Sequence, residues 1–353
     1  MQFGDIPLRN IWLLFLYAAN LVQFKDEFSA DVEVATDLPD LIGRLLAHSV
    51  EKRARRPLTR NYQTENATLS RVRGRIDLVD TFTRRLLDRG QVSCIFETHT
   101  FNTPRNRLVR SALDQLGKRL RNNDTAHRCR HLARELTSLG IGPDHPGRAE
   151  LAKDQIGRND KTDLIMVRLA ELVFTIAIPT ETEGLHKLPR AEATTHLIRK
   201  LFEKAIGNAL RLELEPEGWR INQGHRLKWP VTECSSGLTA MLPGMATDIE
   251  LLHPPTQRKI IIDTKFTHIF TRSQFRTEIL KSGYLYQLYA YLRTQEDACT
   301  SSDLLTEGML LHPQTGEAIC EHATIQGHTL HFRTIDMTAD PQAFEKALRH
   351  LII

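Results

Sequence analysis

The hydrophobic periodicity changes near the middle of the chain, and this change constrains the fold more than any other feature. In the first half, apolar residues recur at spacings of three and four, which indicates helices with one buried face, and only two short strands are expected. In the second half, predicted strands alternate with helices, an order typical of α/β domains. The sequence therefore predicts two structural classes in one chain.

The predicted elements follow this division. In the first half, helices are predicted over residues 11–22, 38–53, 106–120, 128–139 and 162–178, and strands over 67–76 and 91–100. In the second half, helices are predicted over residues 191–214, 278–293 and 341–351, and strands over 219–228, 246–252, 259–266, 308–312 and 329–334. No internal repeat and no low-complexity tract interrupts this order.

Two breaks separate the halves. The first begins with a Gly- and Pro-containing segment at residues 139–146 and continues as a polar run to Lys161, and the second extends from Pro179 to Pro189. A chain of 353 residues is long enough for two domains. We therefore predict a mixed α+β domain over residues 1–185 and an α/β domain over residues 186–353.

The composition is that of a soluble globular protein. Hydrophobic residues make up 41% of the chain and charged residues 25%, which argues against a disordered or fibrous protein. The longest apolar stretches, residues 11–19 and 164–178, are too short or are interrupted by Arg168 and Glu171, so neither is expected to span a bilayer. Residues before Ile11 lack the pattern of a secretory signal. We expect a cytoplasmic protein without a membrane segment.

The cysteines favour reduced thiols over a disulfide framework or a zinc site. Five cysteines are scattered along the chain without a C-x-x-C pair. His127, Cys129 and His131 form the one cluster of potential zinc ligands. On a helix, only His127 and His131 share a face, whereas structural zinc needs four ligands. A solvated helix surface is therefore the favoured interpretation of this cluster.

Positive charge is concentrated in one segment. Residues 51–120 contain 16 Lys and Arg against 7 Asp and Glu, although the whole chain carries a net charge of only +4. Such a segment suits a nucleic acid or an acidic protein surface as its partner. Ordinary solvated helix faces rich in Arg explain the same count. Charge alone does not decide between these interpretations.

Several common enzyme motifs are absent from the sequence. There is no GxxxxGK[ST] segment for binding ATP or GTP, no GxSxG and no HExxH. The pair Gly140 and Gly142 follows no predicted strand and precedes Pro143, so it does not fit a dinucleotide-binding turn. Nucleotide hydrolysis by this chain, serine hydrolase chemistry and zinc proteolysis are therefore disfavoured.

The most informative segment is a predicted hairpin. A β-branched run, Ile260–Ile262, leads directly into Asp263 and Lys265, which strand alternation places on one side while Thr264 faces away. The preceding strand carries Asp248. Two neighbouring carboxylates repel unless a divalent cation neutralises them, and carboxylate oxygens suit Mg²⁺ or Mn²⁺. With a lysine beside the cation, this set of groups is suited to the hydrolysis of phosphodiesters.

A D-x-K triplet alone is weak evidence, because a surface ion pair at a strand end produces the same pattern. Three contexts strengthen the functional interpretation. The charges emerge from a strand that is predicted to be buried, where unpaired ions are costly. Asp248 precedes them at a distance that a hairpin allows. Downstream, Gln287 and Tyr291 lie four residues apart on one helical face.

These residues carry a family resemblance. Asp248, residues 262–266 and residues 286–292 resemble the core of PD-(D/E)xK nucleases with its Q-x-x-x-Y helix. More narrowly, they resemble the McrC family, the nuclease subunits of modified-cytosine restriction systems. Further segments match McrC signatures, namely residues 6–11 with 16–18, residues 72–77 and residues 103–108. The resemblance therefore covers most of the chain.

The resemblance implies an architecture and a reaction. It implies a PD-(D/E)xK restriction-endonuclease-like domain that cleaves double-stranded, modified DNA with Mg²⁺, or with Mn²⁺ in its place. Asp248 and Asp263 would bind the metal, and Lys265 would orient the attacking water or stabilise the transition state. Gln287 and Tyr291 would position the DNA strand or the water.

The resemblance also implies a partner. An AAA+ GTPase of the McrB type would bind GTP and recognise the modified DNA, and the amino-terminal domain of this chain would contact it and stimulate its GTPase. Arg73 and Arg75 are candidates for that contact. The same basic segment is also suited to binding DNA, and the sequence leaves both assignments open.

Three residues depart from the family pattern or extend it. Thr247 stands before Asp248 where the signature has proline. Glu250 shares a strand face with Asp248, and an exposed charge at the strand edge is its favoured interpretation. Glu203 matches a helix motif found ahead of the core in related nucleases. Support of the metal and a salt bridge with Lys204 or Arg199 are equally consistent with its position.

Two other functions remain open at this point. The chain could act as a regulator that activates the GTPase ring without cleaving DNA itself. It could also be a stand-alone repair nuclease of the RecB type, which would cleave DNA without a GTPase.

Overall fold

The computed structural model describes most of the chain, and it divides into two compact units. The described residues are 6–56, 58–154, 156–157, 161–177, 190–235, 237–267, 269–271, 279–296, 306–314 and 316–352. The large unit combines residues up to Glu33 with residues from Pro179 onward, and the small unit comprises Val34–Ile178.

This division differs from the predicted one at the start of the chain. The predicted boundary at residues 185 and 186 lies outside the described residues. The first helix, α1 (Leu8–Ala18), was assigned by sequence to the first domain, but it belongs to the large unit. All residues from Asn10 to Tyr17 are buried, so this helix is apolar on nearly every side and needs partners all around it.

Two buried asparagines hold α1 in the large unit. The Asn10 side-chain amide donates a hydrogen bond to the carbonyl oxygen of Met337 (2.7 Å), far along the chain. At the other end of α1, the Asn208 amide donates to the carbonyl oxygen of Tyr17 (3.0 Å). Because buried amides are costly without partners, these bonds specify the position of the helix as well as stabilising it.

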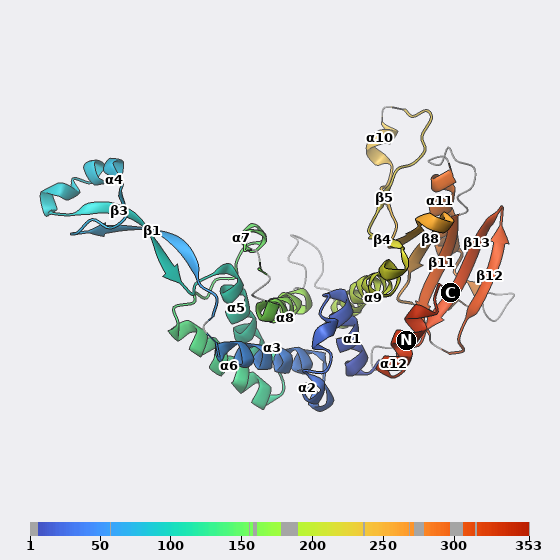
Figure 1. Ribbon diagram of the computed structural model, residues 1–353, viewed down its shortest axis with the longest axis horizontal. Coiled ribbons are helices and arrows are strands. Elements are labelled where there is room, and N and C mark those ends of the chain that lie inside the picture. Colours follow the sequence, from blue (N-terminus) through green and yellow to red (C-terminus); the bar gives the residue numbers. More distant parts are fainter. Residues whose placement is uncertain are drawn as a thin grey trace. The chain divides into compact units, whose positions relative to one another are not determined.

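The small unit consists of helices and a three-stranded sheet. Its helices are α3 (Leu38–Ala54), α4 (Leu78–Thr83), α5 (Pro104–Arg119), α6 (Asn123–Ser138), α7 (Arg148–Lys153) and α8 (Lys161–Ala177), with a 3-10 turn η3 (Leu86–Arg89). The sheet has the order β1 (Asn61–Leu69), β3 (Val92–Thr100), β2 (Arg75–Ile76). In Figure 1, β1 and β3 leave the helices of this unit as a long antiparallel ribbon with α4 near its end. We call residues 61–100 the arm.

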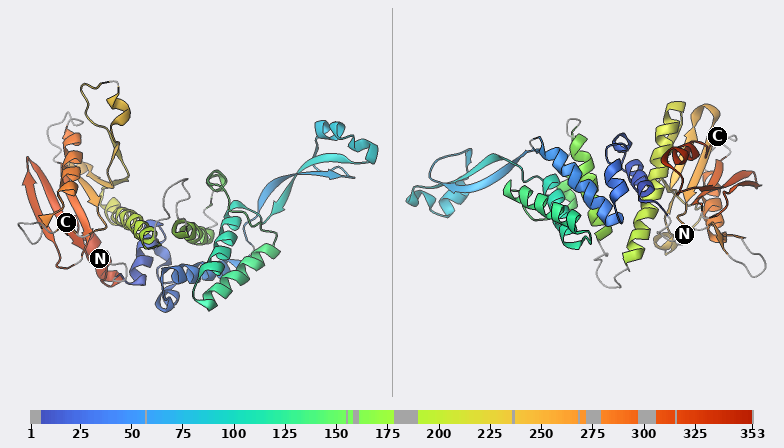
Figure 2. Two further views of the ribbon diagram at one scale, coloured as in Figure 1. Left: turned by 180° about the vertical axis from the view of Figure 1, so that it is seen from behind. Right: turned by 90° about the horizontal axis from the view of Figure 1, so that it is seen from below.

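The large unit is built on a six-stranded mixed sheet, seen from two sides in Figures 1 and 2. The strand order is β12 (Cys320–Ile325), β13 (His328–Ile335), β11 (Thr306–Pro313), β8 (Arg258–Thr264), β7 (Ile249–His253), β4 (Arg220–Gln223). Strands β8, β11 and β13 are parallel, whereas β4, β7 and β12 pair in the antiparallel sense. The α/β prediction for the second half is confirmed at this level.

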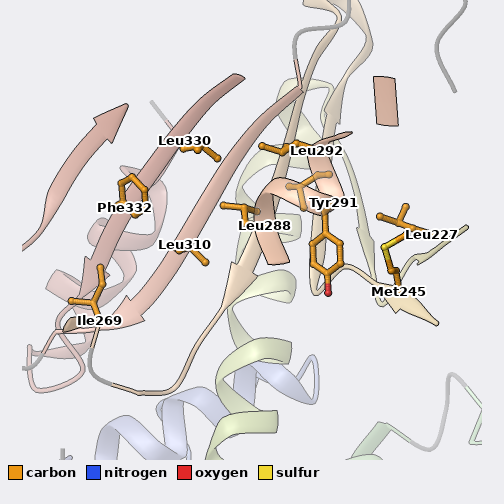
Figure 3. Close-up of a cluster of buried hydrophobic side chains, with 10 residues drawn as sticks. Leu227, Met245, Ile269, Leu288, Tyr291, Leu292, Leu310, Leu330 and Phe332 are labelled. Atoms are coloured by element: carbon orange, nitrogen blue, oxygen red, sulfur yellow. The ribbon is translucent and has the colours of Figure 1, made fainter. Parts of the chain in front are cut away.

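Helices and short ribbons complete the large unit. The helices are α2 (Ser29–Val34), which crosses the unit boundary, α9 (Arg190–Leu214), α10 (Leu238–Met241), α11 (Ser282–Glu296) and α12 (Pro341–Arg349). Two small ribbons pair β5 (Arg226–Leu227) with β6 (Met245–Ala246) and β9 (Phe270–Thr271) with β10 (Ile279–Leu280). Helix α11 lies over one face of the sheet, where its Leu288 and Leu292 join Leu310 and Phe332 in a buried core (Figure 3).

Most predicted elements are present, and two predicted strands are divided by glycine. The predicted strand over residues 67–76 is broken at Gly74, whose φ is +68° and where a Cβ atom would lie 2.4 Å from the carbonyl oxygen of Ile95. The predicted strand over 219–228 divides at Gly224, with φ of +65°. The edge strand β12 was not predicted, because its side chains are largely exposed and polar. Among the described residues, no helix has the length and apolar character needed to cross a membrane.

Candidate active site

The candidate site lies at the open end of the β7–β8 hairpin. The antiparallel register pairs Ile249 with Ile262. Asp248 directly precedes Ile249 and Asp263 directly follows Ile262, so the two carboxylates are neighbours across the hairpin. Lys265 comes immediately after β8. The sequence predicts Asp248 within a strand. In the structure it lies instead in a bend just before β7.

The three predicted groups are brought together. Lys265 Nζ lies 3.0 Å from Oδ1 and 2.9 Å from Oδ2 of Asp263, a residue that is 1% exposed. Asp263 Oδ2 is buried and has no well-directed hydrogen bond among the described residues. Asp248 Oδ2 accepts hydrogen bonds from the backbone N–H (2.7 Å) and the hydroxyl (2.9 Å) of Thr264. Strand alternation alone gives no indication of this Thr264 contact.

Glu203 of α9 adds a third carboxylate. Burial raises its pKa, and the negative charge of Asp248 raises that pKa further, so the two carboxylates are close enough to repel. The alternative salt bridge is not found among the described residues: Lys204 and Arg199 are both exposed, and the positive charge of Lys204 lowers the pKa of Glu203 without an ion pair at contact distance. The structure therefore places Glu203 beside the site.

Negative charge is in excess at this site. Burial raises the pKa of Asp263 to about 6, with a further contribution from Asp248 and Glu203 that the Lys265 ammonium opposes. Burial lowers the pKa of Lys265, but the adjacent Asp263 carboxylate more than reverses this, and the net shift of that pKa is upward. The Asp248 and Asp263 carboxylates thus share the Lys265 ammonium group, whereas Glu203 is also influenced by Lys204 and Lys200, and this arrangement favours binding of a further cation beside the two aspartates.

Helix α11 contributes the predicted glutamine and tyrosine. Gln287 Nε2 donates a hydrogen bond to Tyr291 Oη (2.6 Å). Burial raises the pKa of Tyr291, and the charge of Asp263 also raises it, so the phenol lies within electrostatic reach of the carboxylates. Figure 3 shows the Tyr291 ring extending from α11 beside Met245, with which it shares a buried core. The effect of Asp263 on the pKa of Tyr291 places this residue near the strand ends, whereas the hydrogen bond of Gln287 is to Tyr291 itself.

Glu250 has a different role from the predicted exposed charge. It is 4% exposed, so the expectation of a solvated strand edge is wrong. Its carboxylate lies 2.8 Å from Nδ1 of His225, accepts a hydrogen bond from Thr247 (3.2 Å) and lies 3.9 Å from Nζ of Lys259. His225 directly precedes β5 and Thr247 directly follows β6, so Glu250 holds the two ends of the β5–β6 ribbon together. Thr247 is also the residue before Asp248.

The residues present suit a magnesium site made of two carboxylates. Mg²⁺ is commonly held by one or two carboxylates together with waters and substrate phosphate, and Asp248 and Asp263 supply such a pair. Apart from the Lys265 ammonium group 2.9 Å away, the buried Oδ2 of Asp263 has no hydrogen-bond partner among the described residues, so it retains a lone pair for a cation. In the described ranges, no group of three or more His, Cys, Asp or Glu side chains has metal-binding geometry. The fit is therefore to two protein ligands, with Glu203 outside the ligand set.

Arg73 and Arg75 belong to the small unit and lie on the arm. Both side chains are exposed, and the Arg73 guanidinium stacks 4.2 Å from the centroid of the Phe96 ring. The same end of the arm carries large apolar side chains that are 54% to 77% exposed: Val72, Leu78, Val79, Phe82 and Leu87. Monomeric globular proteins rarely expose a cluster of large apolar side chains unless it binds a partner, so this end of the arm is indicated as an interaction surface. Sequence reasoning identified the charges but missed these apolar residues.

Comparisons with known proteins show which proteins this chain is similar to. The profile of a family described as "McrBC 5-methylcytosine restriction system component" matches residues 4–306. The chain is 24% identical over 341 residues to the "Type IV methyl-directed restriction enzyme EcoKMcrBC" of Escherichia coli (strain K12), covering 96% of this chain and 94% of that relative. The fold resembles a chain in the refined half-complex from a tetradecameric assembly of Thermococcus gammatolerans McrB AAA+ hexamers with bound McrC. That likeness has a TM-score of 0.53 at 14% identity and covers 95% of this chain and 75% of the other.

Proposed function

Since the chain belongs to the family of McrBC 5-methylcytosine restriction system components, we propose that it is the nuclease subunit of a type IV restriction system. In this proposal it cleaves modified double-stranded DNA in a Mg²⁺-dependent reaction. In this proposal the large unit is a PD-(D/E)xK nuclease domain, and the order of α9, the β7–β8 hairpin and α11 in its mixed α/β fold supports that assignment. The reaction is hydrolysis of DNA phosphodiesters in a cytoplasmic defence system.

One observation carries the proposal: the buried Asp263 carboxylate and the partly buried Asp248 carboxylate beside it share the Lys265 ammonium group, and the Glu203 carboxylate lies nearby. Asp248 and Asp263 would hold Mg²⁺, with Mn²⁺ as a substitute. A bound divalent cation supplies Lewis-acid activation of water and of the phosphate. Lys265, held by Asp263, would stabilise negative charge on the phosphate, and the Gln287–Tyr291 pair would orient the attacking water or the strand.

The partner is an AAA+ GTPase of the McrB type. The Thermococcus structure contains McrB AAA+ hexamers with bound McrC, and the same kind of complex is proposed for this chain. The arm is the candidate contact surface, because it combines Arg73 and Arg75 with an exposed apolar group. Binding of the arm would stimulate GTP hydrolysis by the partner. This assigns the basic arm to the partner and not to DNA.

The test uses the full chain with its partner GTPase, GTP, Mg²⁺ and a duplex carrying 5-methylcytosine. Asp263→Ala is expected to abolish DNA cleavage and to leave stimulation of GTP hydrolysis intact. Glu321→Ala, which removes an exposed acid from the edge strand β12, is the matched control and should cleave normally.

Other outcomes separate the competing functions. Undiminished cleavage by Asp263→Ala would overturn the nuclease assignment and leave a regulator of the GTPase. Efficient cleavage by the purified chain without any GTPase would instead favour a stand-alone nuclease of the RecB type.

A further inference from the structure

A second lysine lies next to the candidate active site, on the same aromatic ring as Lys265. Tyr284, in the first turn of α11, is three residues before Gln287 and seven before Tyr291, so all three share one helical face. The ammonium group of Lys265 lies 5.3 Å from the centroid of the Tyr284 ring, and that of Lys281 lies 5.5 Å from it. Both distances are within the range of a cation–π interaction.

The Tyr284 ring is itself fixed by the loop that follows Lys265. Its hydroxyl lies 3.4 Å from the hydroxyl of Thr267, and the ring centroid lies 5.9 Å from that of His312. His312 is fully buried, and its Nδ1 donates a hydrogen bond to the carbonyl oxygen of Thr267 (2.8 Å). The ring therefore has a defined position relative to the backbone that carries Lys265.

The two lysines differ in what neutralises them. Lys265 is paired with Asp263, as described above. Lys281 has no carboxylate within ion-pair distance among the residues that the structure describes, and its side chain is only partly exposed. Two ammonium groups held on one ring repel each other and are stabilised by an anion that approaches both. The carboxylates of the site lie on the Lys265 side, so Lys281 remains available for an external anion.

We propose that Lys281 is a phosphate-binding residue of the nuclease site, held beside Lys265 by the Tyr284 ring, and that it contacts a backbone phosphate of the DNA strand being cleaved. The inference rests on the proposed nuclease function and adds a substrate contact to it. Lys265 acts at the scissile phosphate, and Lys281 binds a phosphate adjacent to it on the same strand. Tyr284 is the positioning residue for both ammonium groups.

The test measures DNA binding separately from cleavage. Binding of a fluorescent duplex to the complete complex is followed over a range of salt concentrations in an Asp263→Asn background, which prevents cleavage. Loss of one phosphate contact should reduce the slope of log K against log salt by about one. Lys281→Gln is expected to show that reduction and binding several-fold weaker, whereas Lys281→Arg keeps the wild-type slope. Lys346→Ala, an exposed lysine of α12, is the charge-matched control and should change neither quantity.

A second variant tests the role of the ring. Tyr284→Leu should weaken binding as Lys281→Gln does and should also lower the cleavage rate, because Lys265 loses its support. Tyr284→Phe keeps the ring and should retain most binding. Tryptophan fluorescence of each variant reports whether the large unit remains folded.

The outcomes distinguish this inference from the proposed function. If Asp263→Asn abolishes cleavage but Lys281→Gln binds DNA with the same slope and affinity as Lys346→Ala, the phosphate-binding role is overturned and the nuclease function stands. If Asp263→Asn cleaves normally, the proposed function itself fails, whatever Lys281 does.

Discussion

Each unit contains a buried cluster of charges, and the two clusters are built differently. In the small unit, Arg105 donates hydrogen bonds to Asp154 (3.0 Å) and to Asp163 (3.1 Å), and Arg53 also pairs with Asp163. Two guanidinium groups thus balance two carboxylates. In the large unit, the Asp248 and Asp263 carboxylates share the Lys265 ammonium group, and Glu203 lies close enough to Asp248 for the two to repel. This difference indicates that a structural cluster pairs its charges internally, whereas the candidate active site retains an excess of negative charge that an external cation can neutralise.

The balanced cluster also explains a family signature. Residues 103–108 resemble a McrC motif, yet they lie in the small unit and fix its architecture. The Asn106 side-chain amide donates to the carbonyl oxygens of Thr59 (3.1 Å) and Phe101 (2.9 Å), which stand just before β1 and just after β3. Asn106 therefore ties the chain at both ends of the arm to α5. A motif that is specific to a family need not belong to the active site.

The largest predicted effect on stability follows from removing one carboxylate of the balanced cluster in the small unit. Asp163→Asn removes one charge and leaves two buried guanidinium groups with incomplete pairing, so we expect the small unit to lose about 3–5 kcal/mol of unfolding free energy. Hydrogen exchange of α5 and α8 amides measures this unit separately. Asp114→Asn, which removes an exposed carboxylate from α5, is the control and should change little. A small effect of Asp163→Asn would mean that the two clusters do not differ in kind.

Removing Lys265 from the other cluster should affect the reaction more than the stability of its unit. Lys265→Gln is expected to slow DNA cleavage about 10²- to 10³-fold, the usual loss when one group that stabilises transition-state charge is removed. Mg²⁺ binding should persist, because both metal-binding carboxylates remain. Cleavage in the complete complex and metal titration of the same variant give the two measurements. Equal loss of cleavage and of metal binding would contradict separate roles for the lysine and the carboxylates.

Sequence patterns specified the hairpin but not the groups that surround it. The register of Asp248 and Asp263 follows from a buried isoleucine run and a short turn, both local features. Thr264 and Tyr284 were missed, because their contacts depend on the bend before β7 and on the position of α11 over the sheet. Helix α1 was assigned to the wrong unit for a related reason: its partner α9 lies far along the chain, and hydrophobic periodicity carries no information about which elements pack together.

Glu307 is a carboxylate of the large unit whose charge is paired internally, and this pairing should make the stability of the unit depend on pH. Burial tends to raise the pKa of Glu307, but hydrogen bonds from His331 and Arg258 dominate and lower it to about 2, from 4.5. Between these pH values the unfolded chain binds a proton that the folded protein does not, so this stabilisation is present above about pH 4.5 and is lost as the pH falls toward 2. The contribution is roughly 3 kcal/mol.

Urea unfolding followed by tryptophan fluorescence tests this pH dependence, because Trp12, Trp219 and Trp229 all lie in the large unit. The stability difference between wild type and Glu307→Gln should shrink as the pH is lowered from 6 toward 2. A difference that stays constant over this range would show that Glu307 is not held ionised by its partners.

The smallest predicted effect is stabilisation by Mg²⁺, and it should be confined to the cluster with excess negative charge. A ligand that binds only the folded state at ten times its Kd adds about 1.4 kcal/mol to the unfolding free energy. Tryptophan fluorescence should therefore report a more stable large unit when Mg²⁺ is added, whereas hydrogen exchange in α5 and α8 should be unchanged. Asp263→Asn should lose this response, because one of the two metal-binding carboxylates becomes an amide. If Mg²⁺ stabilised the wild type and Asp263→Asn equally, the cation would bind elsewhere, and excess negative charge would no longer separate the functional cluster from the structural one.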